Sequence, residues 1–209
     1  MQSDPALPEI TGLILAGGRA SRMQHLDKGL QLLDGRTLVE HVAERLGPQV
    51  DCVAINANRH LQDYAKFGFP VWTDREFDVA VTDESQFQGP LAGVETGLFH
   101  CSTPYLLTVP CDSPFLPQNL ALALWTALRE QNADIAVACT GDANNARLQP
   151  VFCLMPANCL KQIQEYLRAG GRRMDGWYGN FRVARVYFPD AAEFRNINTL
   201  EELQACAAK

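Results

Sequence analysis

The hydrophobic and polar positions along this chain follow two alternating periods. Short apolar runs rich in strand-forming residues lie at residues 11–15, 50–56, 70–73, 105–109, 134–138, 151–154 and 182–187. Longer segments with helical spacing lie at residues 38–46, 91–100, 117–130, 157–167 and 199–207. Strands that alternate with helices build a mostly parallel sheet that is covered on both faces. The pattern therefore predicts an α/β fold with three layers, α/β/α.

Signals at helix ends support this assignment. Pro117 suits the first turn of a helix in which Leu120, Leu124 and Leu128 fall on one face. Residues 199 and 202 are threonine and glutamate, the spacing of a capping box.

Residues 74–88 are largely polar and acidic, and they form a long connection that predicts a mobile surface loop. No repeat, low-complexity tract or linker divides the chain. We therefore expect a short N-terminal extension over residues 1–9 and a single domain over residues 10–209.

The loop after the first apolar run is the most informative segment. Gly17 and Gly18 carry no Cβ, so the backbone can take φ > 0 and bring its N–H groups close to an anion. Arg19, Arg22 and Lys28 follow and supply positive charge. An isolated glycine pair is more often a simple turn, and the loop matches neither a P-loop nor G-x-G-x-x-G. The whole segment nevertheless predicts a phosphate-binding loop of another kind.

The same loop resembles a known signature, L-A-G-G-x-x-x-R-M-x(4)-K, of nucleotidyltransferases. It is most similar to that of the MobA family of molybdenum cofactor guanylyltransferases, and the resemblance extends from Ile10 to about Leu203. It implies a Rossmann-like nucleotidyltransferase domain that transfers GMP from GTP to Mo-molybdopterin, forms the guanine dinucleotide cofactor and releases pyrophosphate. The chain has Gln24 and His25 where the family often has glycines, which indicates a reshaped loop.

Asp112 is the candidate metal ligand. It follows the apolar run at residues 105–109, and ligands in such sheets bind beyond the carboxyl ends of the strands. Mg²⁺ takes oxygen ligands, often one or two carboxylates plus substrate phosphates. A turn aspartate between prolines is the simpler alternative. The P-C-D segment is the metal-binding element of the family that the chain resembles, and the resemblance implies Arg22, Lys28 and Asp112 as catalytic residues with Mg²⁺ as cofactor.

Two further motifs resemble the nucleotide site of the family. N-A-N-R ends the second strand at Asn56, and amides suit a base edge or ribose, although Asn-rich strand ends are mostly turns. G-P-L-A-G begins a helix at Gly89, where free N–H groups suit an anion or base, although it also fits a plain helix start. The GTP-binding residues that the resemblance implies are Leu15, Ala16, Gly17, Gly18, Lys28, Asn56, Asp74, Gly89, Pro90, Leu91 and Asp112.

Later basic and amide residues are candidates for the pterin side. The resemblance assigns Arg172 and Arg173 toward the pterin, and Asn196 and Asn198 of N-x-N-T near the reacting phosphates. A helix C-cap followed by a solvated charge pair is the simpler interpretation of Gly170-Gly171-Arg172-Arg173.

Composition narrows the class of protein. The net charge of −6 and the pI near 5.2 argue against broad binding to nucleic acid or anionic membranes. Seven cysteines without a C-x-x-C pair indicate neither a disulfide framework nor a zinc site. Without a secretory signal or an apolar run of membrane-spanning length, we expect a cytoplasmic enzyme. The resemblance implies molybdenum-insertion proteins and apo-molybdoenzymes or their chaperones as partners.

Several rival functions remain open at this stage. One is another nucleotidyltransferase of the same fold, either a cytidylyl enzyme acting on the same pterin or a sugar-phosphate enzyme. The second glycine of L-A-G-G favours guanine over the L-A-A-G of the cytidylyl relatives. The other rival is a non-catalytic chaperone that binds GTP or the pterin, which the presence of both Lys28 and Asp112 disfavours.

Overall fold

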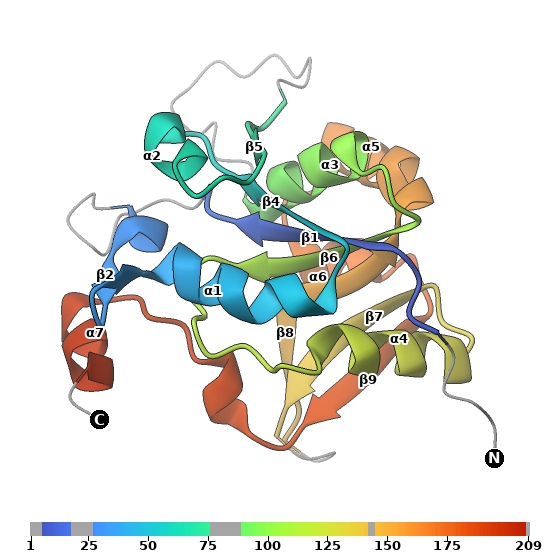
Figure 1. Cartoon of the computed structure of the whole chain (residues 1–209). Coiled ribbons are helices and arrows are strands. Elements are labelled where there is room, and N and C mark those ends of the chain that lie inside the picture. Colours follow the sequence, from blue (N-terminus) through green and yellow to red (C-terminus); the bar gives the residue numbers. More distant parts are fainter. Residues whose placement is uncertain (1–5, 18–26, 76–88, 142–144, 208–209) are drawn as a thin grey trace.

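The computed structural model describes residues 6–17, 27–75, 89–141 and 145–207. These residues form a seven-stranded sheet with helices on both faces (Figure 1). The strands of the sheet, in spatial order, are β5 (Val71–Trp72), β4 (Cys52–Asn56), β1 (Ile10–Leu15), β6 (Tyr105–Pro110), β8 (Arg147–Pro156), β7 (Ile135–Thr140) and β9 (Val183–Phe188). A separate small hairpin joins β2 (Leu32–Leu33) to β3 (Arg36–Thr37).

The helices confirm the predicted three-layer architecture. They are α1 (Leu38–Leu46), α2 (Leu61–Ala65), α3 (Pro90–His100), α4 (Leu120–Glu130), α5 (Leu160–Arg168), α6 (Met174–Tyr178) and α7 (Leu200–Ala207). Short 3-10 turns are η1 (Lys28–Leu30), η2 (Gly47–Gln49), η3 (Ala157–Cys159) and η4 (Ala191–Phe194). In the described part of the chain, no helix is long and apolar enough to cross a membrane.

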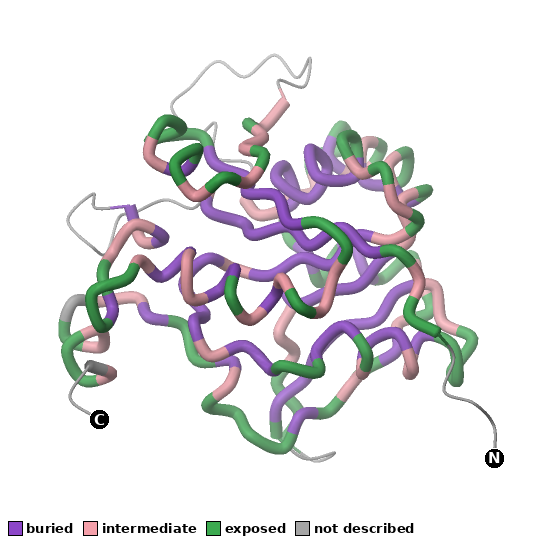
Figure 2. The backbone as a smooth tube through the Cα atoms, in the orientation of Figure 1, coloured by how far each residue is buried: buried purple, intermediate pink, exposed green. Residues whose placement is uncertain are grey.

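Two hydrophobic cores lie on opposite faces of the sheet. α1 and α4 pack on one face, and α3, α5 and α6 pack on the other. β1 supplies both cores, because Ile10 and Ile14 point to the first face while Leu13 and Leu15 point to the second. Side chains alternate across a strand, so a strand buried on both faces is mostly apolar on both. Figure 2 shows that the strands at the centre of the sheet, including β1, are almost wholly buried.

One strand runs against the others. β8 pairs antiparallel with both β6 and β7, whereas the remaining neighbours in the sheet are parallel. The sequence predicted only residues 151–154 of β8, because the first half of this strand is polar and partly exposed. Apolar periodicity marks a buried strand without giving its direction.

The start of α4 differs from the prediction. The apolar face of Leu120, Leu124 and Leu128 is buried as expected, but the helix begins at Leu120 rather than at Pro117. Gln49 caps it from η2, since its Oε1 accepts a hydrogen bond from Ala121 N (3.1 Å) while its Nε2 donates to Pro117 O (2.9 Å). A side chain far away in sequence therefore sets this boundary.

Candidate active site

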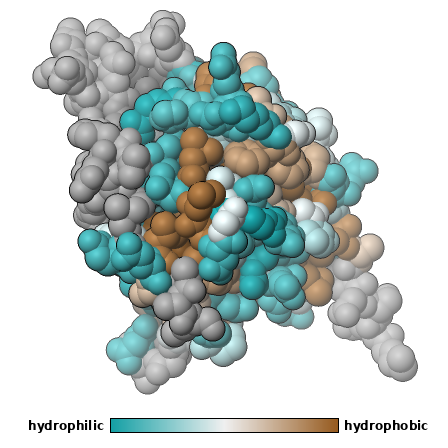
Figure 3. All heavy atoms as spheres, turned by 60° about the vertical axis from the view of Figure 1, so that its left-hand side comes forward, coloured by the Kyte–Doolittle hydropathy of each residue, from teal (hydrophilic) through white to brown (hydrophobic). Residues whose placement is uncertain are grey.

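The carboxyl ends of the parallel strands β4, β1 and β6 meet at one edge of the sheet. Leu15 pairs with Asn56 on one side and with Pro110 on the other. A pocket of about 250 Å³ lies at this edge. Figure 3 shows the molecule from the side toward which β1 and β6 run, with hydrophobic side chains in the middle and hydrophilic ones around them. The described residues that line the pocket are Leu15, Ala16, Gly17, Asp27, Lys28, Asn56, Asp74, Gly89, Pro90, Pro110, Cys111, Asp112, Val151, Asn196 and Asn198.

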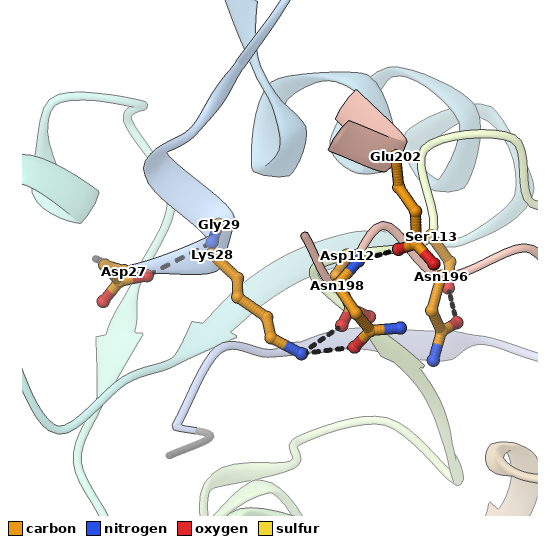
Figure 4. Close-up of polar contacts among 8 residues, drawn as sticks. All are labelled: Asp27, Lys28, Gly29, Asp112, Ser113, Asn196, Asn198 and Glu202. Carbon is orange, nitrogen blue, oxygen red and sulfur yellow. Dashed lines mark hydrogen bonds and ion pairs between the residues drawn. The ribbon is translucent and has the colours of Figure 1, made fainter. Parts of the chain in front are cut away.

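Lys28, Asp112 and Asn198 come from three segments that are distant in sequence, and contacts of Lys28 join them in the lining of this pocket. Lys28 Nζ donates to Asp112 Oδ2 at 3.1 Å and to Asn198 Oδ1 at 2.6 Å (Figure 4). The partners lie 84 and 170 positions away in sequence. The preceding Asp27 caps η1, because its Oδ1 accepts from Gly29 N (3.2 Å). This turn fixes where the lysine side chain begins.

Asp112 is a carboxylate with little access to solvent. It is 7% exposed, and burial raises the pKa of its carboxyl group above the usual value, although the Lys28 ammonium acts in the opposite direction. Its backbone O accepts from Ile197 N at 2.8 Å. A buried carboxylate favours a cation as partner. The site is therefore suited to positive charge on a ligand or metal ion as well as to Lys28.

The neighbouring Cys111 is poorly suited to act as a nucleophile. Its side chain is buried, and burial together with the Asp112 carboxylate raises the pKa of the thiol well above its ordinary value. Only the thiolate is strongly nucleophilic. The backbone of Cys111 instead extends the pairing between β6 and β1, because its N donates a hydrogen bond to Leu15 O (3.1 Å).

The C-terminal segment completes the side of the pocket that holds Lys28. Ser113 Oγ donates to Asn196 Oδ1 at 2.6 Å, and Asn198 N donates to Glu202 Oε2 at 2.6 Å. Thr199 Oγ1 accepts from Glu202 N (3.1 Å), which is one half of the predicted capping box. The other half of the prediction is wrong. The Glu202 carboxylate accepts from the N of Asn198 and not from that of Thr199, and so holds Asn198 beside Lys28.

Asn56 and Asp74 line the part of the pocket beside β4 and β5, on the other side of β1 from Asp112. Asn56 Nδ2 donates to Asp74 Oδ1 (2.8 Å) and to Trp72 O (3.1 Å). Asn58 makes a paired contact with Asp74, since its Nδ2 donates to Oδ2 and its Oδ1 accepts from Asp74 N, each at 2.8 Å. Both carboxylate oxygens of Asp74 are thus bound by amides, and this part of the pocket is fixed in shape.

Gly17 and Gly89 are needed for different reasons. A Cβ on Gly17 would lie 3.0 Å from Asn58 Nδ2 and 3.2 Å from Asn56 Oδ1. Gly17 does not use the freedom of glycine to take a positive φ. Its lack of a side chain permits close approach to the two asparagines instead. Gly89 does have a positive φ (69°), and it is the N-cap of α3, with Pro90 in the first turn.

Several predicted residues do not line the pocket. Leu91 belongs to the first turn of α3, and its side chain is fully buried in the core and does not line the pocket. Arg172 donates from Nη1 to Leu167 O (2.9 Å) at the end of α5, and Arg173 forms an exposed ion pair with Asp175 (2.6 Å). Neither guanidinium lines the pocket, so this geometry matches a helix end with a solvated charge pair. Gly18, Arg19, Arg22 and residues 76–88 lie outside the described residues.

Sequence reasoning missed three residues that support the site. Asn58 is part of N-A-N-R, but the motif indicates no role for it beyond that of its neighbours. Asp27 stands out only as a neighbour of Lys28, and Tyr64 carries no signal at all. Tyr64 OH donates to Asp27 Oδ1 at 2.5 Å, and α2, which carries Tyr64, was not predicted. Its five residues are too short for a helical period to be recognised.

Solved structures share this fold at low sequence identity. A molybdopterin-guanine dinucleotide biosynthesis protein A from Archaeoglobus fulgidus superposes with a TM-score of 0.71 at 18% identity, covering 95% of this chain and 97% of that chain. A 4-diphosphocytidyl-2C-methyl-D-erythritol synthase from Anaerococcus prevotii gives 0.71 at 14% identity, covering 97% and 98%. The fold alone therefore does not distinguish between these two kinds of protein.

Sequence comparison is more specific. Residues 12–180 match the model of the MobA-like NTP transferase domain. A molybdenum cofactor guanylyltransferase from Cupriavidus taiwanensis is 49% identical, with 98% of this chain and 99% of that protein covered. The protein of the same name from Cupriavidus necator is 50% identical, with 95% and 96% covered. The chain therefore belongs to the MobA-like NTP transferase family.

Proposed function

We propose that this protein transfers GMP from GTP to Mo-molybdopterin and releases pyrophosphate. The observation that supports this best is the contact of Lys28 with Asp112 and Asn198 in the pocket, which joins the three motifs of a phosphate site. The near-full-length similarity to molybdenum cofactor guanylyltransferases supports the choice of substrates. The proposal takes residues 10–209 as one catalytic domain, since β1 begins at Ile10 and Asn198 lines the same pocket.

The reaction needs no protein nucleophile. A phosphate oxygen of the pterin substrate is anionic at neutral pH and forms the new bond to the α-phosphorus of GTP. The bond between that phosphorus and the bridging oxygen to the β-phosphate breaks, and the electron pair leaves with pyrophosphate. Catalysis then depends on positioning and on neutralisation of charge. Among the residues that the structure describes, Lys28 is suited to neutralise the charge of the phosphates. We propose that Arg22 contributes further positive charge.

The donor atoms in the pocket fit a magnesium ion that binds together with the nucleotide. Among the described residues there is no cluster of three or more acidic, histidine or cysteine side chains for a metal. Mg²⁺ in nucleotide sites needs only one or two carboxylates, because phosphates and water supply the remaining oxygens. Asp112 is the carboxylate proposed to hold it. When bound, the ion would neutralise negative charge on the nucleotide phosphates.

Guanine selectivity is the first expected result. Sites that hydrogen-bond a base edge reject analogues that leave buried polar groups unpaired, so turnover with GTP should exceed that with CTP by about 10²-fold or more. The measurement is pyrophosphate release with Mg²⁺ and the pterin substrate across GTP, CTP and ATP. Equal rates with GTP and CTP would contradict the guanylyl assignment. Binding of GTP without any release of pyrophosphate would indicate a binding protein instead.

Gly93→Ala should weaken GTP binding through Asn56. A Cβ on Gly93 would lie 2.2 Å from Asn56 Oδ1, and the amide cannot move without breaking its bonds to Asp74 and Trp72. We expect the Kd for GTP to rise by roughly tenfold or more, since small displacements of positioning groups are costly. Isothermal titration calorimetry with GTP and Mg²⁺ measures this.

Gly97→Ala is the matched control on the same helix. Its Cβ would meet Leu13 Cδ2 at 2.4 Å in the core and not the pocket. We expect it to lower the midpoint of thermal unfolding while leaving the Kd for GTP unchanged. If both variants bound GTP like the parent, the assignment of Asn56 to the nucleotide site would fail.

The proposed cellular location of the enzyme follows from its thiols, and its proposed partners follow from its substrates. All seven cysteines are free, which suits the reducing conditions of a cytoplasm. Because the pterin dinucleotide is an intermediate for other proteins, we propose that molybdenum-insertion proteins and apo-molybdoenzymes or their chaperones are its partners. Co-purification of the tagged protein from cytosolic extract tests both points.

A further inference from the structure

Asp74 lies beyond the end of the strand that leads to it. β5 is an edge strand of two residues, and the last backbone bond that ties it to β4 runs from Ala57 N to Trp72 O (3.0 Å). Asp74 follows this point and nevertheless lines the pocket. Backbone beyond the end of a sheet has low local stability unless other contacts hold it. Side-chain contacts must therefore fix the position of Asp74.

The next residue, Arg75, is attached to α3 by three contacts. Its backbone N donates to Thr96 Oγ1 (3.3 Å), and its Nη1 donates to Glu95 Oε1 (2.9 Å). Its guanidinium carbon also lies 3.6 Å from the centre of the Phe99 ring, which is a cation–π contact. These contacts hold the chain directly after Asp74 against the helix that begins at the pocket with Gly89.

Glu95 is an unusual residue at its position. It is fully buried in α3 between Val94 and Thr96, which are also fully buried. Its Oε1 accepts from Arg75 and from Gln164 Nε2 of α5 (2.8 Å), whereas its Oε2 has no partner among the described atoms. The Glu95 carboxylate has lost its hydration, whereas the Arg75 side chain that pairs with it is still 38% exposed, and an ion pair with a buried member seldom exceeds well-packed apolar residues in stability. Stability alone therefore gives no reason for a glutamate here.

We propose that Glu95, acting through Arg75, is a positioning residue for the nucleotide site. The pair holds residue 75 on α3 and thereby sets the place of Asp74 against Asn56 and Asn58. This inference rests on the proposed function and extends it to residues that do not touch the substrate. Asp74 follows β5 and Asp112, the partner of Lys28, follows β6 on the other side of β1, so the pair governs affinity for the nucleoside part of GTP and leaves the phosphate contacts unchanged.

The test is the double variant Arg75→Met with Glu95→Gln. Removing only the arginine would leave an unpaired buried charge and risk unfolding, whereas the double variant has no charge at either position. The new amide on α3 can still accept from Gln164, and the new thioether can still cover Phe99. We expect the Kd for GTP with Mg²⁺ to rise by about tenfold or more. The Kd for pyrophosphate with Mg²⁺ should remain that of the parent, because its contacts are at Lys28 and Asp112.

Asp134→Asn with Arg182→Met is the matched control. This pair is also an arginine–carboxylate contact (2.8 Å), but it is exposed and lies beside β7 and β9, away from the pocket. The control should bind GTP like the parent. Arg75→Lys is a second variant that keeps the charge of Glu95 paired, and we expect it to raise the Kd for GTP by a smaller factor.

The outcomes separate this inference from the proposed function. Parental affinity for GTP in both Arg75 variants would overturn the positioning role while leaving the function intact. Equal weakening of GTP and pyrophosphate binding in the double variant would also overturn it, since that indicates general loss of structure. A parent protein that does not bind GTP would overturn the proposed function and this inference together.

Discussion

Asp112→Asn is expected to lower kcat for GMP transfer by roughly 10²-fold or more, the usual size of a lost electrostatic contribution in an active site. The amide keeps the shape of the side chain but removes the charge proposed to hold Mg²⁺. It also removes the ionic partner of Lys28, which lies 3.1 Å away. The measurement is pyrophosphate release under saturating GTP and pterin as Mg²⁺ is varied.

Asp190→Asn is the control for this substitution. Asp190 is exposed and caps η4 by accepting from Ala192 N (2.9 Å), a bond that asparagine also makes. Its kcat should equal that of the parent. A near-normal rate for Asp112→Asn at ordinary Mg²⁺ would mean that another residue holds the ion.

Lys28→Ala should weaken GTP binding and slow transfer, with a combined loss in kcat/KM of about 10²-fold or more because a charge at the phosphates is lost. The substitution also removes the hydrogen bond to Asn198 (2.6 Å) and leaves Asp112 buried without its cation. Lys28→Arg should restore activity only in part, since a planar guanidinium does not replace a compact ammonium. Steady-state kinetics with GTP as the varied substrate separates the effects on KM and kcat.

Lys161→Ala provides the comparison for an ordinary surface lysine. Its side chain is 86% exposed and its nearest acid, Glu165, is 3.9 Å away on the same helix. Exposed pairs of this kind contribute little to stability. Thermal unfolding of Lys28→Ala must be measured beside the kinetics. A folded Lys28→Ala protein that bound GTP and turned over like the parent would refute the phosphate-site argument.

The strands and helices of the sheet were largely predictable. Runs such as β1 and β6 are mostly apolar because both faces of the sheet are covered, and this pattern is visible in a sequence. The direction of β8 and the short helices α2 and α6 were not predictable. Direction depends on partners far away in the chain, and helices of five residues have too few turns to show a period.

The sequence by itself determined which residues end the central strands and hence the positions of Asn56 and Asp112 at one edge of the sheet. It did so because strand periodicity and the rule for parallel sheets are local properties of the chain. Only the tertiary structure brought Lys28 to Asp112 and Asn198, attached Arg75 to Glu95, and placed Arg172 at the end of α5. Each of these contacts depends on side-chain geometry across separate elements, which periodicity does not encode.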